Sequence, residues 1–401
     1  MPRIRTIDDL DVSGRRAIVR LDLNVPVENG EVRDMTRIER VLPTLRELLD
    51  KGSALVLLSH FERPKGRVVP EMSLRPVSAA LARALRRPVT FVATDWRDDA
   101  AARAAAAVKP GEILLLENTR FHPGEEDNDL GFARVLAALG DVFINDAFSA
   151  AHRAHASTEA IAHERPSAAG RAMQAELAAL ARALDSPERP LAAIVGGAKI
   201  STKLDLLSNL LAKVDMLIIG GAMANTFLAA QGRAIGKSLC ERDLFATARD
   251  IMAEAEGRGR EILLPADAVV AREFKKQAAS RTVRLDDVAP DEMILDIGAG
   301  TIKAVNSALD RARTLVWNGP FGAFEIEPFE RGTQAVARHA AERTRQGNLV
   351  SIAGGGDTVA ALDQAGVARD FTYVSTAGGA FLEWLEGKAL PGVTALEMDR
   401  T

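Results

Sequence analysis

Charged and amide side chains follow the short apolar runs in the first half of the sequence. These positions are Asp22 and Asn24, His60 and Arg63, Asn118 and Arg120, and Asn145 and Asp146, with Arg37 and Arg153 shortly after the first and last runs. A guanidinium group pairs with carboxylates and phosphates through two parallel hydrogen bonds, so convergent arginines are typical of a site for a small, multiply charged anion. A single arginine is more simply a surface residue, but four at successive run ends favour such a site.

Glycine clusters follow the apolar runs in the second half, which therefore carries a different chemistry. They are Gly196-Gly197, Gly220-Gly221, Gly298-Ala299-Gly300, Asn318-Gly319-Pro320, Gly354-Gly355-Gly356 and Gly378-Gly379. Glycine lets backbone N–H groups approach a phosphate closely, and the N-terminus of a following helix adds its dipole. In one such turn, glycine could be needed only for the backbone conformation of a tight strand-to-helix connection. A series of such turns indicates a site for a nucleotide polyphosphate.

Three charged residues accompany these glycines. Lys199 and Lys203 stand four apart at an expected helix start, where they are either ordinary helix lysines or phosphate ligands. Asp357 directly follows the triple glycine. A carboxylate there is either a helix N-cap or a ligand of a phosphate-bound magnesium ion.

Three other motifs fail on inspection. Residues 232–238 resemble a Walker A loop but lack its first glycine and follow a helical pattern. Residues 354–359 lack the third glycine of a dinucleotide fingerprint, and 294–301 lack the last glycine of the motif used by methyltransferases that bind S-adenosylmethionine. The six histidines have no carboxylate or cysteine pattern that indicates a metal site.

The elements that position these residues follow from the apolar runs. In the first half we expect strands at 17–25, 54–59, 89–93, 113–117 and 142–145, and in the second half at 191–195, 216–219, 261–264, 293–297, 314–317, 349–353 and 372–375. Helical patterns separate them, and unbroken apolar runs are typical of parallel strands covered on both faces. The pattern predicts an α/β fold with two doubly wound, parallel-sheet (Rossmann-like) domains. A helical pattern at 174–184, ended by the proline-containing turn 185–190, predicts the helical hinge that joins them.

Length and composition agree with this organisation. The 401 residues exceed the usual size of one domain, and 47% hydrophobic with 26% charged residues is ordinary globular composition. A net charge of −4 provides no basic field for nucleic acid, and the single Cys240 excludes an internal disulfide. The first ten residues lack the apolar segment of a signal peptide, and no apolar run is long enough to span a membrane. We expect a cytoplasmic protein.

Seven segments, in order along the chain, carry a specific resemblance to a known family. They are 20–26 (RLDLNVP), 59–64 (SHFERP), 116–121 (LENTRF), 145–157 (NDAFSAAHRAHAS), 196–203 (GGAKISTK), 317–325 (WNGPFGAFE) and 354–358 (GGGDT). Together they resemble phosphoglycerate kinase from end to end. The resemblance implies reversible phosphoryl transfer between 1,3-bisphosphoglycerate and ADP, giving 3-phosphoglycerate and ATP, in glycolysis. It also implies a monomer that closes about its hinge and uses Mg²⁺ with the nucleotide.

The resemblance further implies a division of the chain and of the site. Residues 1–172, completed by about 388–401, would bind 3-phosphoglycerate, 173–186 would be the connecting helix, and 187–387 would bind the nucleotide. The implied phosphoglycerate ligands are Asp22, Leu23, Asn24, Arg37, His60, Phe61, Glu62, Arg63, Arg120 and Arg153. The implied nucleotide ligands are Lys203, Gly298, Asn318, Glu325 (ribose), Gly354, Gly355, Gly356, Asp357 (through Mg²⁺) and Thr358. Arg37, Lys203, Gly355 and Gly378 would stabilise the transferring phosphoryl group.

The sequence departs from the family pattern at two positions. Glu62 stands where the family has glycine in its Ser-His-x-Gly-Arg-Pro turn, and Ala377 replaces the first of three glycines before Gly378. The first departure bears on the shape of the substrate loop. The second bears on how closely the backbone approaches the transferring phosphoryl group.

The implied reaction needs no general base, because its nucleophile is a carboxylate that is ionised at neutral pH. It needs in-line alignment and cancellation of charge on the moving phosphoryl group, which Arg37, Lys203, magnesium and a helix N-terminus can provide. Two alternatives remain: a methyltransferase, which would bind S-adenosylmethionine in place of ATP, and a non-catalytic two-lobe anion-binding protein, which would not need Lys203.

Overall fold

The computed structural model describes residues 3–398, and the chain divides into two compact units. The first unit contains the residues up to Ala178 together with the segment from Ala389 onward, and the second is Ala179–Lys388. The division falls inside helix α6 (Arg171–Leu184), the helix that the sequence predicts as the connection.

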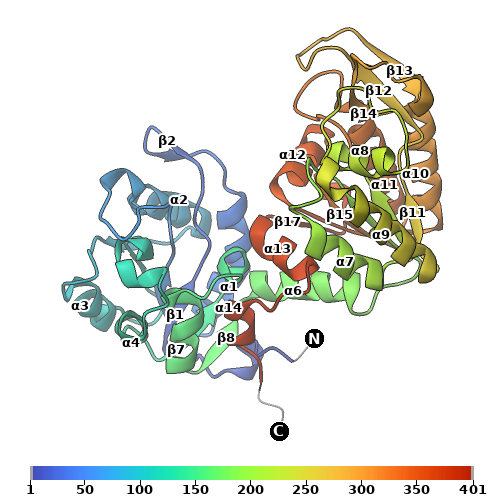
Figure 1. Ribbon diagram of the computed structural model, residues 1–401. Helices are drawn as coiled ribbons and strands as arrows, with labels where there is room; N and C mark the ends of the chain where they lie inside the picture. The colour runs from blue at the N-terminus through green and yellow to red at the C-terminus, as the bar shows by residue number, and fades with distance from the viewer. Residues whose placement is uncertain (1–2, 399–401) are drawn as a thin grey trace. The chain divides into compact units, whose positions relative to one another are not determined.

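The first unit is built on a six-stranded parallel sheet with the strand order β5-β6-β4-β1-β7-β8 (Figure 1). The strands are β1 (Arg16–Arg20), β4 (Ala54–Leu58), β5 (Thr90–Val92), β6 (Ile113–Leu116), β7 (Val142–Asn145) and β8 (Ser167–Ala169). The other elements are the hairpin β2 (Val27–Glu28) and β3 (Glu31–Val32), and helices α1 (Thr36–Asp50), α2 (Arg75–Leu85), α3 (Ala100–Ala107), α4 (Leu130–Ala137) and α5 (Ile161–Glu164). Every residue of β4 is buried, as expected for a strand covered on both faces.

The end of the chain returns to this unit. Gly392 at the start of α14 (Pro391–Thr394) donates its N–H to Ala151 O at 2.9 Å. Glu397 forms an antiparallel bridge with Ile4, and Met398 N donates to Arg3 O at 2.9 Å. The residues from Ala389 to Met398 are therefore an integral part of the first unit.

The second unit has its own six-stranded parallel sheet, in the order β11-β10-β9-β15-β16-β17 (Figure 1). The strands are β9 (Leu191–Val195), β10 (Met216–Ile219), β11 (Glu261–Leu263), β15 (Thr314–Asn318), β16 (Val350–Gly354) and β17 (Tyr373–Ser375). Its helices are α7 (Leu204–Lys213), α8 (Gly221–Ala230), α9 (Phe245–Gly257), α10 (Ala299–Arg311), α11 (Arg331–Arg345), α12 (Gly356–Gln364) and α13 (Gly378–Leu385). Both sheets confirm the predicted α/β class.

A small antiparallel sheet departs from the predicted pattern. The strand expected at 293–297 is β14 (Met293–Ile297), but it pairs antiparallel with β12 (Asp267–Ala271), which also pairs with β13 (Ser280–Arg284). The expectation that this run belongs to a parallel sheet was therefore wrong. Its first three residues are only half-buried, because this sheet lies outside the parallel one and is not covered on both faces.

Among residues 3–398, the helices are too short or too polar for any of them to cross a membrane.

Candidate functional site

In the first unit, a carboxylate and an arginine meet at the carboxyl end of β1. Arg37, in the first turn of α1, directs Nη1 to both carboxylate oxygens of Asp22, at 2.9 and 2.8 Å. Ser149 donates its hydroxyl to the same carboxylate at 2.5 Å. Arg37 keeps about a third of its side chain exposed, so its remaining N–H groups can reach a ligand. The sequence predicted both Asp22 and Arg37, and the structure brings them together.

His60, two residues after the end of β4, is buried. Its Nδ1 lies 3.1 Å from Nη2 of Arg20, whose Nε also donates to Ser157 Oγ at 2.8 Å. Burial, and then the nearby charges of Arg20 and Arg120, hold the pKa of His60 well below its ordinary value. The imidazole is therefore neutral at pH 7 and can serve as a hydrogen-bonding group, while the arginines carry the positive charge.

The loop after β4 adopts a conformation that glycine favours. Glu62 has a φ of 51°, in the left-handed region, which glycine adopts without the steric cost that a side chain brings. The loop is held by Asn24 Oδ1, which accepts the N–H of Glu62 at 3.0 Å, and by Arg120 Nη1, which donates to the carbonyl of Glu62 at 2.8 Å. The expected ligands Asn24 and Arg120 thus both contact the backbone of Glu62.

The remaining expected residues of this unit divide by exposure. Leu23 and Phe61 are buried, and their backbone N–H groups bind Ser59 Oγ and Asn118 Oδ1. Arg63 and Arg153 are exposed. The loops at the carboxyl ends of the strands therefore carry arginines whose side chains are buried to different extents. This arrangement suits a multiply charged anion.

In the second unit, Lys203 is the central cation. It is the N-cap residue of α7, and its Nζ donates to Gly196 O and to Asn318 Oδ1, both at 2.6 Å. Burial lowers the pKa of Lys203 to about 8, against the opposing effect of Asp357 and Glu386. These two contacts exclude the alternative that Lys203 is an ordinary, solvated helix lysine.

Glycines from three turns surround this lysine; we call Gly197, Gly355, Gly356 and Gly378 the glycine cluster. A Cβ atom added to Gly197 would lie 3.3 Å from Lys203 Cε, and one on Gly378 would lie 3.9 Å from Gly356 N. Gly355, the N-cap residue of α12, has a φ of 98°, and a Cβ there would lie 2.5 Å from Asn318 Nδ2. The N-termini of α12 and α13 therefore open beside one another, next to Lys203.

Hydrogen bonds from Asn318 and Thr358 fix this arrangement. Asn318 Nδ2 donates to Gly354 O at 2.8 Å, and Thr358 Oγ1 accepts the N–H of Gly319 at 2.7 Å. Both side chains are buried. They tie the end of β15 and the residue after it to the end of β16 and to the first turn of α12.

Ala377, the second departure from the family pattern, causes no backbone strain. Its φ is −94°, a value that any residue adopts, and its side chain is buried. The glycine missing at this position is therefore not needed for the shape of the turn before α13.

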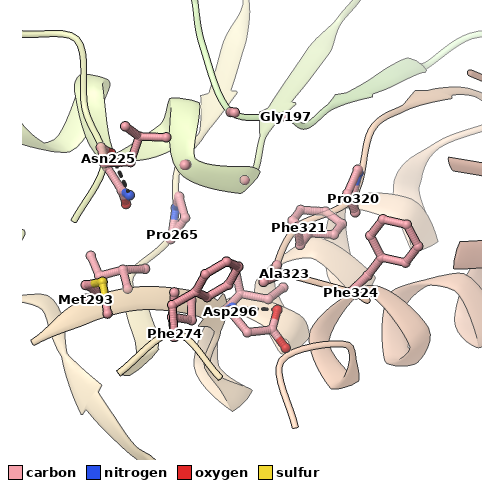
Figure 2. Close-up of a pocket in the computed structure, with 18 of the residues that line it drawn as sticks. Gly197, Asn225, Pro265, Phe274, Met293, Asp296, Pro320, Phe321, Ala323 and Phe324 are labelled. Atoms are coloured by element: carbon pink, nitrogen blue, oxygen red, sulfur yellow. Dashed lines mark hydrogen bonds between the residues drawn. The ribbon is translucent and has the colours of Figure 1, made fainter. Parts of the chain in front are cut away.

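A cavity of about 400 Å³ extends from this region (Figure 2). Gly197, Ala198 and Asp357 line it where it meets the glycine cluster. Apolar side chains line much of the remainder, namely Leu239, Pro265, Phe274, Met293, Ile294, Leu295, Ile297, Phe321 and Phe324. Glu325, expected to bind a ribose, also lines it and is exposed. A flat apolar group attached to phosphates fits a cavity of this composition.

Of the expected nucleotide ligands, Glu325 and Asp357 line this cavity, whereas Lys203, Asn318, Gly354, Gly355, Gly356 and Thr358 do not. Gly298 does not line it either. It is the N-cap residue of α10, whose first turn is occupied by the carboxylate of Asp267. That carboxylate accepts the N–H groups of Gly300 at 2.8 Å and Thr301 at 2.7 Å. A phosphate is therefore not needed to cap this helix, and Gly298 is required for close packing, since a Cβ there would lie 2.4 Å from Asp267 Cγ.

Sequence reasoning missed four buried polar residues near the two sites. They are Arg20, Glu125, Asn225 and Asp296. Arg20 and Glu125 both bind the hydroxyl of Ser157, and Asn225 and Asp296 line the cavity of the second unit. The signal for Arg20, Asn225 and Asp296 is a polar residue inside an apolar run; Glu125 gives no such signal.

Comparisons with known proteins agree with this geometry. Residues 7–388 match the model of the family described as phosphoglycerate kinase. The phosphoglycerate kinase of Methylobacterium radiotolerans is 62% identical over 397 residues, which cover 99% of both chains. Among solved structures, phosphoglycerate kinase from Coxiella burnetii has a TM-score of 0.91 at 42% identity, covering 98% of this chain and 99% of its own. The enzyme from Pyrococcus horikoshii has a TM-score of 0.81 at 29% identity, covering 98% of both chains.

The likeness thus extends through both units and includes all the segments described above. The chain therefore belongs to the phosphoglycerate kinase family, the phosphotransferases that move a phosphoryl group reversibly between 1,3-bisphosphoglycerate and ADP in glycolysis.

Proposed function

We propose that the first unit binds 3-phosphoglycerate or 1,3-bisphosphoglycerate and that the second binds ATP or ADP with Mg²⁺, in a cytoplasmic monomer. The observation that carries the proposal is the position of Lys203. Its half-buried amine is held by Gly196 O and Asn318 Oδ1 beside two open helix N-termini. A cation and converging N–H groups at one point match the charge of a nucleotide polyphosphate.

The nucleotide occupies the cavity of the second unit. Its phosphates lie against the glycine cluster, where α12 and α13 begin, and its base enters the apolar part of the cavity. Glu325 lies at the edge of the same cavity and accepts the ribose hydroxyls. Thr358 acts indirectly: its hydroxyl is engaged by Gly319 N, so it shapes the turn that faces the phosphates.

The residues present fit a phosphate-bound magnesium ion. Asp357 is exposed, lies in the first turn of α12 and lines the cavity. Among the described residues there is no group of three or more His, Cys, Asp or Glu side chains that could hold a metal by itself. Magnesium is commonly held by one or two carboxylates together with substrate phosphates, and Asp357 can provide that carboxylate. When bound, the ion would cancel charge on the nucleotide phosphates.

The phosphoglycerate is held by the arginines of the first unit. Arg63 and Arg153 are exposed and meet its phosphate, while Arg37, fixed by Asp22, lies nearer the carboxyl end of β1 and meets its carboxylate. His60 is neutral and buried, so it orients the ligand by hydrogen bonding. The carboxylate needs no general base, because it is already ionised at neutral pH.

The reaction follows from these placements. A carboxylate oxygen attacks the γ-phosphorus of ATP in line while the bond to the β,γ-bridging oxygen breaks, so that ADP leaves and the acyl phosphate forms. Lys203, Arg37 and the N–H groups of the glycine cluster stabilise the charge of the transition state. Direct transfer requires the two ligands to meet, so binding of both must draw the two units together and exclude water. No covalent intermediate on the protein is needed.

Calorimetric titration of the full-length protein tests the division of ligands. Arg63→Ala and Arg153→Ala are expected to weaken 3-phosphoglycerate binding at least ten-fold and to leave Mg-ADP binding within two-fold. Glu325→Ala and Asp357→Asn are expected to do the reverse. Variants of the first unit that weaken only nucleotide binding would overturn the assignment.

A further inference from the structure

One side chain in the cavity of the second unit has an unused hydrogen-bonding group. Asn225 on α8 lines the cavity and is only 1% exposed (Figure 2). Its Oδ1 is buried and has no hydrogen-bond partner among the residues that the structure describes. A buried acceptor without a partner destabilises the protein unless a ligand or water satisfies it. The unpaired oxygen therefore points to a donor that arrives with the ligand.

The orientation of this amide is fixed by its surroundings. Asn225 Nδ2 donates to the carbonyl of Leu239 at 3.2 Å. The segment that carries this carbonyl is itself attached to α8, because Glu241 N donates to Thr226 Oγ1 at 3.0 Å. Rotating the amide by 180° would place Oδ1 against the carbonyl of Leu239, with two acceptors facing each other. Asn225 therefore presents an acceptor, and not a donor, on its other side.

The other polar side chains of the cavity cannot take this role. Asp296 is buried, but its Oδ1 accepts the N–H of Ile297 at 2.8 Å and its Oδ2 that of Gly332 at 2.7 Å. Glu325 and Asp357 are exposed, and Asp357 lies where the cavity meets the phosphate-facing turns. Among the described polar side chains that line the cavity, Asn225 is thus the one that has a buried acceptor atom without a hydrogen-bond partner.

We propose that Asn225 selects the base of the nucleotide, by accepting a hydrogen bond from the exocyclic amino group of adenine. This inference rests on the proposed placement of the nucleotide in the cavity. Adenine carries an amino donor at its six-position, whereas hypoxanthine and guanine carry a carbonyl acceptor there. With those bases, the carbonyl oxygen at the six-position would face Oδ1 of Asn225, and both atoms are acceptors. A site built to accept a hydrogen bond rejects an analogue that lacks the donor, because the buried acceptor then stays unpaired.

Steady-state kinetics with three diphosphates tests the proposal in the wild-type protein. The probes are ADP, inosine diphosphate, and purine riboside diphosphate, which has only hydrogen at the six-position. We expect KM for ADP to be at least ten-fold lower than for either analogue, with similar kcat, because the contact is the same in the ground and transition states. Equal KM values for ADP and purine riboside diphosphate would overturn the proposal without any variant.

Asn225→Leu removes the acceptor and keeps a similar volume. Its expected effect is to raise KM for ADP about ten-fold while KM for the two analogues changes less than three-fold, so that the preference disappears. Phe274→Leu is the matched control, since it alters an apolar side chain of the same cavity and should raise all three KM values together. A preference for ADP that persists in Asn225→Leu would overturn the role of Asn225. If neither variant changes any KM, the nucleotide does not occupy this cavity, and the placement under the proposed function fails as well.

Discussion

Lys203 Nζ and Asn318 Oδ1 lie 2.6 Å apart, although 115 positions separate the two residues in the sequence. Asn318 also donates from Nδ2 to Gly354 O, so one amide at the end of β15 connects the lysine that precedes α7 to the end of β16. The lysine is thereby held at a fixed point beside the glycine cluster. A cation held in place before the substrate arrives costs little reorganisation when charge develops in the transition state.

The lowered pKa of Lys203 predicts a pH dependence. Burial brings this pKa to about 8 in the free protein, so the amine loses its proton as the pH rises through 8. We expect kcat/KM for ATP to fall above pH 8. Bound phosphates favour the charged amine, so the fall in kcat should begin at a higher pH. Measuring both parameters between pH 6.5 and 9.5 checks this.

Lys203→Arg provides the control for that profile, because a guanidinium group stays charged throughout this range. Whatever its absolute rate, the variant should show no fall in kcat/KM near pH 8. A fall at the same pH in Lys203→Arg would assign the titration to another group.

Lys203 and Arg37 are predicted to act mainly in the transition state. Lys203→Ala should lower kcat by roughly two to four powers of ten, with a much smaller loss of ATP affinity, as for other cationic groups in phosphoryl transfer. Arg37→Ala should lower kcat similarly while 3-phosphoglycerate affinity changes modestly. Thermal melting verifies that both variants are folded. Near-normal kcat in Lys203→Ala would remove this residue from the mechanism.

The parallel sheets could be predicted from the sequence because their strands are unbroken apolar runs. Strands β7 and β9 begin and end at the expected residues. The small sheet could not be predicted in the same way, because β13 is not an apolar run. Four of its five residues are exposed, namely Ser280, Arg281, Thr282 and Arg284. Its stability comes from pairing with β12, which depends on residues distant in sequence.

The turn at Gly298 shows the same limit on a local scale. A glycine after a strand and before a helix predicts a phosphate-facing turn when the strand belongs to a parallel sheet. Strand β14 pairs antiparallel with β12, and that pairing brings Asp267 to the N-terminus of α10. The local sequence around Gly298 carries no sign of this carboxylate, which is 31 positions earlier in the chain.

Glu62 offers a prediction about backbone strain. A residue with a side chain in the left-handed region is destabilised by roughly 1 kcal/mol relative to glycine. We therefore expect Glu62→Gly to be more stable than Glu62→Ala by about that amount, the reverse of the usual order of glycine and alanine. Both variants remove the carboxylate, so the comparison isolates the backbone effect. Urea denaturation of the pair measures it, and a more stable alanine variant would contradict the left-handed conformation.

Asp296 provides the last prediction, which concerns stability and pH. Burial raises its pKa from 3.8 to about 7, against the opposing hydrogen bonds from Gly332 and Ile297. Between these two pH values the folded protein holds a proton that the unfolded chain has lost. The stabilisation is therefore complete below about pH 4 and is lost as the pH rises through 7. Replacing the carboxyl group with an amide that does not titrate removes this contribution.

We expect the free energy of unfolding of the wild type to fall, relative to that of Asp296→Asn, by about 1.4 kcal/mol per pH unit between pH 5 and 6.5. The difference between the two proteins should become constant above pH 8, where Asp296 is ionised in both the folded and the unfolded state. Asp363→Asn, at an exposed carboxylate of α12, controls for loss of charge in the same unit. Denaturation monitored through the buried Trp317 reports on this unit, and Trp96 can be replaced by Phe to remove the signal of the first unit. A pH-independent difference between the wild type and Asp296→Asn would show that the buried carboxyl group does not titrate in this range, so that its two backbone hydrogen bonds outweigh the cost of burial.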